Sequence, residues 1–175
     1  MSVNCLMRVT TATIVFFSLL SCSNAISAVD VLKKGAGVGL HSADSRQITF
    51  VMSDDETLVW ENLRGEWVFV NYWAEWCDPC YDEIPELNAL DKTPGVTVLG
   101  VNFDGKRGEA LRKVMSEMNV EFNVFQDVFH QDPGQILGWD RPLAMPATMV
   151  VTPDGELKEA RFGEQSKEEL LEATR

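Results

Sequence analysis

Residues 73–81 of the chain read WAEWCDPCY, and this stretch carries two of its four cysteines. Cys77 and Cys80 are separated by Asp78 and Pro79. A pair at this spacing can bind a metal ion, close a small inert loop, or exchange electrons as a disulfide. The residues around the pair decide among these three possibilities and, with them, the fold.

Ligand counting argues against a metal. A structural zinc site needs four ligands, usually from two such pairs or from one pair and histidines. The remaining cysteines are Cys5 and Cys22, and the two histidines, His41 and His130, lie far apart in sequence. We therefore expect no metal and no cofactor beyond a redox-active disulfide, so that electron exchange and an inert loop remain as alternatives.

The segments that flank the pair predict a buried strand followed by a helix. Residues 66–74, EWVFVNYWA, are rich in β-branched and aromatic residues and apolar on both faces, as in a covered central strand. Residues 81–92 carry apolar side chains at helical spacing: Ile84, Leu87 and Leu90. Cys77 then lies at the helix start, where unpaired N–H groups and the helix dipole favour a thiolate.

This position gives the residues of the motif different roles. A thiolate at Cys77 attacks a disulfide, and Cys80, one turn further on, attacks the mixed disulfide and releases the partner. Pro79 suits the first turn, where its missing N–H costs nothing, and it keeps the sulfurs close. The negative charge of Asp78 opposes the thiolate, so we expect Asp78 to bias the pair towards a reducing potential.

The rest of the domain alternates between strand and helix patterns. Strands are predicted at residues 47–52, 57–60, 95–104 and 121–127 and on both sides of Asp154-Gly155. Helices are predicted at residues 107–119 and 166–175. This order predicts an α/β fold, with a mixed central sheet, helices on both faces and an N-terminal β-hairpin extension.

The motif and its surroundings resemble the thioredoxin superfamily. Residues 63–87, LRGEWVFVNYWAEWCDPCYDEIPEL, are similar to the TlpA/ResA-like branch of membrane-anchored bacterial thiol-disulfide oxidoreductases, and MPAT at residues 145–148 agrees. The resemblance implies a thioredoxin-like domain over residues 46–175. It also implies an enzyme of the protein-disulfide reductase type, with protein thiols and disulfides as substrates and a transmembrane thiol carrier as electron donor.

The resemblance assigns further residues to the site. Pro146 matches the family's cis-proline, which faces the cysteine pair, and the backbone of Met145 would pair with an extended substrate segment. The alternative is a trans proline that begins an edge strand. Glu83 matches an acid that exchanges protons with Cys80, and the alternative is an ordinary exposed acid of the first turn. Trp76 is expected at the apolar rim where partners dock.

Three other features are interpreted more simply. Asn71 stands where thioredoxins carry a buried acid, so we expect a structural hydrogen-bonding group there. Trp73 is expected in the core. Residues 127–140 form an insertion ahead of the Met-Pro pair, which either tunes the choice of partner or is a solvated connector.

The N-terminus predicts export. Arg8 precedes an apolar run, residues 9–20, that is too short to span a bilayer and is typical of a secretory signal. LLSC, which ends at Cys22, resembles a bacterial lipobox. In such signals the cysteine is lipidated and anchors the mature chain in the membrane.

The expected organisation is therefore a signal peptide of residues 1–21, a tether of residues 22–45 and one folded domain. Two alternatives exist for the anchor. Cleavage after Ala25 or Ala28 gives a soluble periplasmic protein. In the second alternative, Cys22 is simply part of an apolar helix and is not a lipidation site.

The formal net charge of −12 argues against nucleic acid as a partner. Three functions compete. The first is a lipid-anchored, periplasm-facing oxidoreductase of the bacterial cell envelope, a reductant rather than an oxidant. The second is a non-catalytic thioredoxin-fold adaptor, which the intact cysteine pair disfavours. The third is a peroxidase of the peroxiredoxin type, which needs a Thr-x-x-Cys nucleophile that the sequence lacks.

Overall fold

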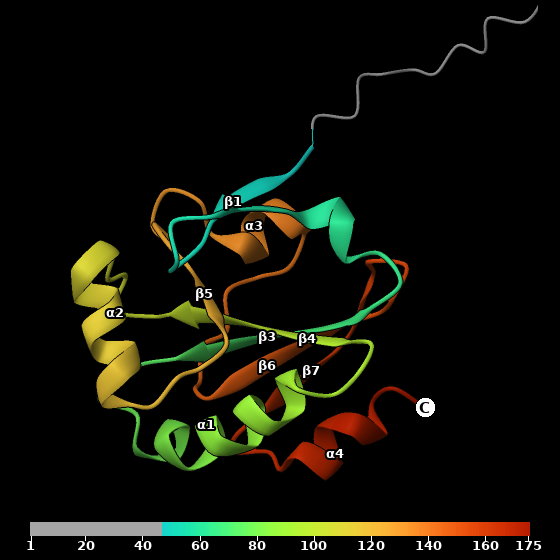
Figure 1. The fold of residues 1–175 in the computed structure, drawn as a ribbon. Helices are drawn as coiled ribbons and strands as arrows, with labels where there is room; N and C mark the ends of the chain where they lie inside the picture. Colours follow the sequence, from blue (N-terminus) through green and yellow to red (C-terminus); the bar gives the residue numbers. More distant parts are fainter. Residues whose placement is uncertain (1–46) are drawn as a thin grey trace, which may run out of the picture. The chain divides into compact units, whose positions relative to one another are not determined.

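The buried run ahead of the cysteines forms strand β3 (Trp67–Trp73), the central strand of the computed structural model, which describes residues 47–175 (Figure 1). β3 is parallel to β4 (Val96–Asn102), and β4 is parallel to the short edge strand β5 (Asn123–Phe125). On its other side β3 is antiparallel to β6 (Ala147–Val151), which pairs with β7 (Leu157–Phe162). The predicted mixed sheet is confirmed.

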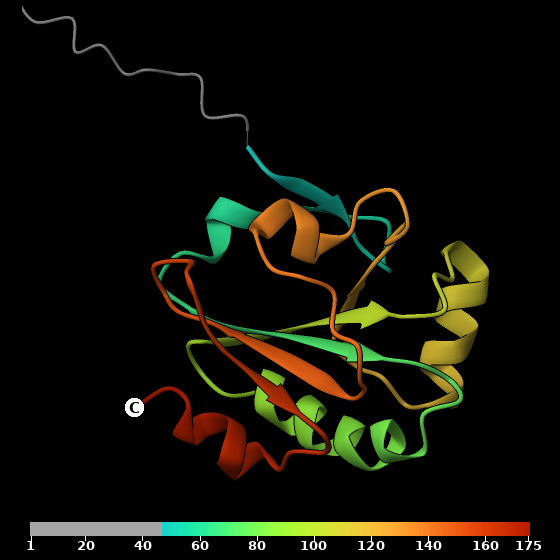
Figure 2. The ribbon, with the colours of Figure 1, turned by 180° about the vertical axis from the view of Figure 1, so that it is seen from behind.

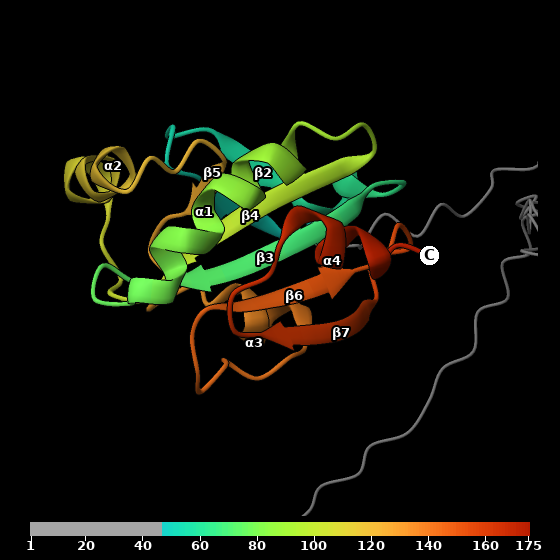
Figure 3. The same cartoon turned by 90° about the horizontal axis from the view of Figure 1, so that it is seen from below.

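Figures 1 and 3 show two helices over one face of this sheet, α1 (Asp78–Asp91) and α4 (Lys167–Glu172), and a third helix, α2 (Gly108–Glu117), beside its β4–β5 edge. Their apolar side chains share one buried cluster with Trp73, which is therefore a core residue, as predicted. Gly100 of β4 permits this packing, because a Cβ atom there would lie 2.9 Å from the Trp73 indole nitrogen.

The opposite face carries the N-terminal hairpin and a short helix (Figure 2). The hairpin consists of β1 (Thr49–Val51) and β2 (Thr57–Val59), paired antiparallel as predicted. The sequence pattern placed Trp60 in the second strand, but Trp60 begins the 3₁₀ helix η2 (Trp60–Leu63). Its indole packs at the edge of the Phe50 ring in a second core cluster, so burial of this ring takes the place of strand pairing.

The insertion contains a helix that the sequence analysis did not predict, α3 (Pro133–Leu137). The Asp132 carboxylate caps it by accepting hydrogen bonds from the first two backbone amides of the turn. The Trp139 indole N–H donates to the Tyr72 hydroxyl of β3 at 3.1 Å, and both rings are buried. A purely solvated connector is therefore wrong for residues 132–139, because the helix and Trp139 are packed on the sheet.

Some predictions fall on the remainder of the chain. The signal peptide of residues 1–21, the lipidation site Cys22 and the tether of residues 22–45 lie outside the described residues. Within residues 47–175, no helix has the length and apolar character needed to cross a membrane.

Candidate active site

The strand directions bring the predicted site residues to one edge of the sheet. β3, β4 and β5 end there together, since Trp73 is paired with Asn102 and Val101 with Phe125. β6 runs in the opposite direction and begins at this edge, where Ala147 pairs with Tyr72. The loops that follow the three parallel strands and the loop that precedes β6 therefore meet, in the place where α/β sheets commonly bind ligands.

The cysteine pair occupies the junction between β3 and α1. Cys77 is the N-cap of α1, in an extended conformation, and Cys80 lies in the first turn; the two form a disulfide with an S–S distance of 2.02 Å. Pro79 lies in the first turn, as predicted, and Asp78 is the exposed acid at the first helical position. Once the disulfide is reduced, the helix N-terminus favours a thiolate at Cys77.

The loop that precedes β6 supplies the second part of the site. The Met145–Pro146 peptide bond is cis, as the resemblance predicts, and the alternative of a trans proline is wrong. Met145 is partly buried against the apolar cluster that contains Cys77 and Cys80. Pro146 is buried and directly precedes β6.

Glu83 lies one helical turn after Cys80 and has only 1% of its surface exposed, so the alternative of an exposed first-turn acid is wrong. Its Oε2 accepts a hydrogen bond from Asn71 Nδ2 at 2.8 Å, and the same amide group donates to Thr148 Oγ1 at 2.9 Å. The structural role predicted for Asn71 is thus the placement of Glu83.

Burial raises the pKa of Glu83 to about 7. The hydrogen bond from Asn71 and the nearby Gln165 backbone oppose this pKa rise, and the nearby charge of Glu164 adds to it. The second oxygen, Oε1, is buried without a hydrogen-bond partner among the described residues. A carboxyl group with this pKa can both accept and release a proton near neutral pH.

Trp76 is 64% exposed beside Cys77, which agrees with the predicted apolar rim. Its indole N–H donates to Asp104 Oδ1 at 2.9 Å, and the Glu75 backbone amide donates to Asp104 Oδ2 at 3.1 Å. The Glu75 carboxylate in turn pairs with Lys106. The loop after β4 therefore fixes the segment that leads into Cys77. Sequence reasoning missed Asp104, because its contact with Trp76 joins positions 28 residues apart.

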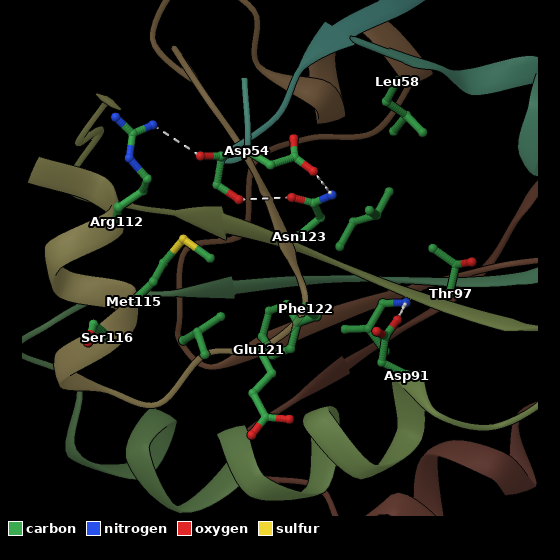
Figure 4. A pocket seen from close by; sticks show the side chains of 14 residues that line it. Asp54, Leu58, Asp91, Thr97, Arg112, Met115, Ser116, Glu121, Phe122 and Asn123 are labelled. Carbon is green, nitrogen blue, oxygen red and sulfur yellow. Dashed lines mark hydrogen bonds between the residues drawn. The ribbon is translucent and has the colours of Figure 1, made fainter. Parts of the chain in front are cut away.

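Two cavities accompany this arrangement. A pocket of about 380 Å³ adjoins the loop that leads to Met145, and its lining includes Leu143 and Ala144. A larger cavity of about 680 Å³ lies over β4, β5 and α2, and none of the predicted site residues lines it (Figure 4). Polar groups there satisfy one another, since Asn123 accepts from Ser53 and donates to Asp54 (Figure 4).

The described residues hold no cluster of three or more His, Cys, Asp or Glu side chains placed to bind a metal ion. The two sulfurs lie at this edge of the sheet, with the buried Glu83 carboxyl group one helical turn beyond Cys80. Their arrangement supports thiol-disulfide exchange coupled to proton transfer.

Comparisons with known proteins agree with this chemistry. The profile of the AhpC/TSA family matches residues 44–160. The thiol-disulfide oxidoreductase ResA of Bacillus thuringiensis is 32% identical over 127 residues, which cover 69% of this chain and 70% of that protein. ResA of Oceanobacillus iheyensis is 32% identical over 109 residues, which cover 61% of this chain but only 54%, about half, of that protein.

Solved structures support the fold. StoA from Bacillus subtilis superimposes with a TM-score of 0.58 at 16% identity, over 73% of this chain and 96% of that one. A thiol:disulfide interchange protein of the thioredoxin family from Chlorobium tepidum gives a TM-score of 0.58 at 22% identity, over 73% and 90% of the two chains. The chain therefore belongs to the AhpC/TSA family of the thioredoxin superfamily and, within it, to the thiol-disulfide oxidoreductases of the ResA type.

Proposed function

We propose that the protein is a lipid-anchored reductant of protein disulfides that works outside the cytoplasm. The observation that carries this proposal is the juxtaposition of a helix-capping Cys77 with a buried Glu83 one turn beyond Cys80. The first favours the attacking thiolate, and the second provides a proton acceptor for the resolving thiol. The relatives named ResA support thiol-disulfide exchange as the reaction type.

The reaction takes place in two exchanges. The Cys77 thiolate attacks one sulfur of the substrate disulfide, and the other substrate sulfur leaves as a thiolate and takes up a proton. Cys80 then gives its proton to the Glu83 carboxylate and attacks the Cys77 sulfur. The second substrate sulfur leaves and is protonated, the Cys77–Cys80 disulfide forms, and two electrons have passed to the substrate.

Regeneration requires a dithiol donor, since the oxidised pair must recover two electrons and two protons. A transmembrane thiol carrier would supply them on the outer side of the cytoplasmic membrane. The proposed anchor is lipid on Cys22, which the resemblance of LLSC to a lipobox supports. The tether of residues 22–45 would then connect the anchor to the domain.

Insulin reduction tests the proposal. The wild type, kept reduced by dithiothreitol, should accelerate the reduction, and Cys77→Ser should abolish the acceleration. After removal of dithiothreitol, reduced Cys80→Ser should instead accumulate a mixed disulfide between Cys77 and an insulin chain, visible as a mass increase that a Cys77→Ser/Cys80→Ser double variant lacks. A wild type that binds reduced insulin chains without turnover would favour the adaptor.

A further inference from the structure

A strap, residues 163–167, runs from the end of β7 to the first residue of α4 and is held at both of its ends. At one end the Gly163 backbone N–H donates to the Pro146 carbonyl oxygen at 2.9 Å. At the other end the Lys167 backbone N–H donates to Glu86 Oε2 at 2.9 Å. The strap therefore reaches from the cis-proline to α1, and Figure 3 shows α4, which follows the strap, beside α1.

The strap passes the Glu83 carboxyl group. Glu83 lies one helical turn before Glu86 in α1, and Glu86 holds one end of the strap. The Gln165 backbone and the Glu164 charge, both in the strap, lie near enough to Glu83 to change its pKa. On the sheet side, Glu83 accepts the hydrogen bond from Asn71. The carboxyl group is therefore enclosed between the sheet and the strap.

The charged groups around Glu83 do little to compensate for its burial. The sheet presents the neutral side chain of Asn71 to it. The titratable groups of α1 and the strap that lie nearest in the chain are Cys80, Glu86, Glu164 and Lys167. Among these only Lys167 is a cation, and its ammonium group donates to the Ala89 carbonyl oxygen, further along α1, at 3.1 Å. The exclusion of water by the strap therefore has a large influence on the Glu83 carboxyl group.

We propose that the strap is a cover that excludes water from the proton acceptor, and that Glu86 is the positioning residue that keeps this cover closed. The inference rests on the proposed function, in which the Glu83 carboxylate takes the proton of Cys80 before Cys80 attacks the mixed disulfide. A carboxylate that loses its solvation becomes a stronger base, because the charged form is destabilised. With the strap closed, Glu83 accepts a thiol proton near neutral pH. With the strap open, its proton affinity falls towards that of an ordinary carboxyl group.

Two pairs of variants remove or retain the hydrogen bond that closes the strap. Glu86→Ala removes the acceptor, whereas Glu86→Gln keeps an oxygen that can accept the same hydrogen bond. Lys167→Pro removes the backbone N–H, whereas Lys167→Ala keeps it and loses only the ammonium group. Proline fits at this position, since Lys167 is the first residue of α4 and Ser166 before it is extended. Within each pair the same charge is lost, so charge alone cannot make the two members differ.

The titration of Glu83 reports the state of the cover. NMR of isotope-labelled side-chain carboxyl groups, assigned by comparison with Glu83→Gln, should give a midpoint near pH 7 in the wild type. Glu86→Ala and Lys167→Pro should each lower this midpoint by about one pH unit, a tenfold loss of proton affinity, because water reaches the carboxylate. Glu86→Gln and Lys167→Ala should keep a midpoint close to that of the wild type.

The second half of the exchange reaction gives the functional measurement. When the reduced protein reacts with dithionitrobenzoate, the attack by Cys77 releases one thionitrobenzoate, and the attack by Cys80 on the mixed disulfide releases the other. The first release should have the same rate in all four variants. The second should slow about three- to tenfold at neutral pH in Glu86→Ala and Lys167→Pro, because a weaker base accepts the Cys80 proton, and not in their partners.

Three outcomes would overturn the inference. A midpoint near pH 7 in both Glu86→Ala and Lys167→Pro would show that the burial of Glu83 does not depend on the strap. An equal fall in both members of each pair would assign the effect to the lost charge. A lowered midpoint with an unchanged second release would show that the cover does not serve the reaction. A wild type without the first release would instead remove the proposed function, which depends on attack by Cys77.

Discussion

The Asn71 side-chain amide donates to Glu83 Oε2 across 2.8 Å and so holds a carboxyl group one helical turn from Cys80. The two residues belong to β3 and α1, the elements on either side of the cysteine motif. Because Asn71 also donates to Thr148, the contact connects the motif to β6, which begins at the cis-proline. The three parts of the site are thus joined by one buried polar group.

Glu83 should make the stability of the protein dependent on pH. Its pKa is about 7 in the folded state against an ordinary value of 4.5, so the folded protein holds the proton more tightly than the unfolded chain does. The free energy of unfolding should therefore fall as pH rises from about 4.5 through 7, by on the order of 3 kcal/mol from this group. Urea unfolding at pH 5 and pH 8 measures the change.

The variant Glu83→Gln should remove this contribution, because glutamine does not titrate. Glu109→Gln, at an exposed position of α2, is the matched control and should behave as the wild type does. Equal pH dependence in Glu83→Gln and Glu109→Gln would show that Glu83 titrates normally and would remove it as a proton acceptor near neutral pH.

Asp78→Ala should change the chemistry of Cys77. The loss of the neighbouring negative charge stabilises the thiolate, so the pKa of Cys77 should fall and the couple should become more oxidising. Absorbance of the thiolate at 240 nm during a pH titration gives the pKa, and equilibration with glutathione gives the potential. Asp82→Ala, another exposed acid of the same helix, should have the smaller effect; an unchanged pKa and potential in Asp78→Ala would contradict the role of Asp78.

Cys22→Ala should release the protein from the membrane. Without the cysteine no lipid can be attached, so the protein should move from the membrane pellet to the soluble fraction of the producing bacterium. The matched control is Cys5→Ala, which lies inside the expected signal peptide and should leave the distribution unchanged. A wild-type protein that is soluble, with a mature N-terminus after Ala25 or Ala28, would contradict the lipid anchor.

Trp139→Phe should destabilise the domain although it lies in the insertion. The change removes the hydrogen bond to Tyr72 and leaves a cavity beside the buried ring, at a cost of about 1–3 kcal/mol. Val51→Ala, at an exposed apolar position of β1, should shift the free energy of unfolding by less than about 0.5 kcal/mol. If both variants unfold at the same urea concentration, the insertion is not anchored through Trp139.

The chemistry of the cysteine motif could be predicted from the sequence because it depends on residues that are close together in the chain. Cys77 follows a buried strand and begins a helix, and both properties are visible within a dozen residues. The role of Asn71 in placing Glu83 was not accessible, since it requires β3 and α1 to be stacked in a known register. Asp104 was missed for the same reason, because its partner Trp76 is reached only through the tertiary fold.

Prediction of the fold from the sequence was limited in a similar way. The strands and long helices follow from hydrophobic periodicity, but α3 has only five residues, too few for a periodic pattern. Its signals were present, with Asp132 and Pro133 at its start and Gly138 in the left-handed region at its end. Trp60 was wrongly predicted to be in a strand. Tryptophan favours strands, but here it begins a 3₁₀ helix, in which its ring is buried.

The reduction potential of the Cys77–Cys80 couple tests the central claim most directly. Equilibration of the folded domain with glutathione buffers, read by alkylation and mass spectrometry, gives the value. A reductant of protein disulfides should have a potential near that of thioredoxin, about −270 mV. A value near −120 mV, typical of a disulfide-forming oxidant, would contradict the proposed direction of electron flow.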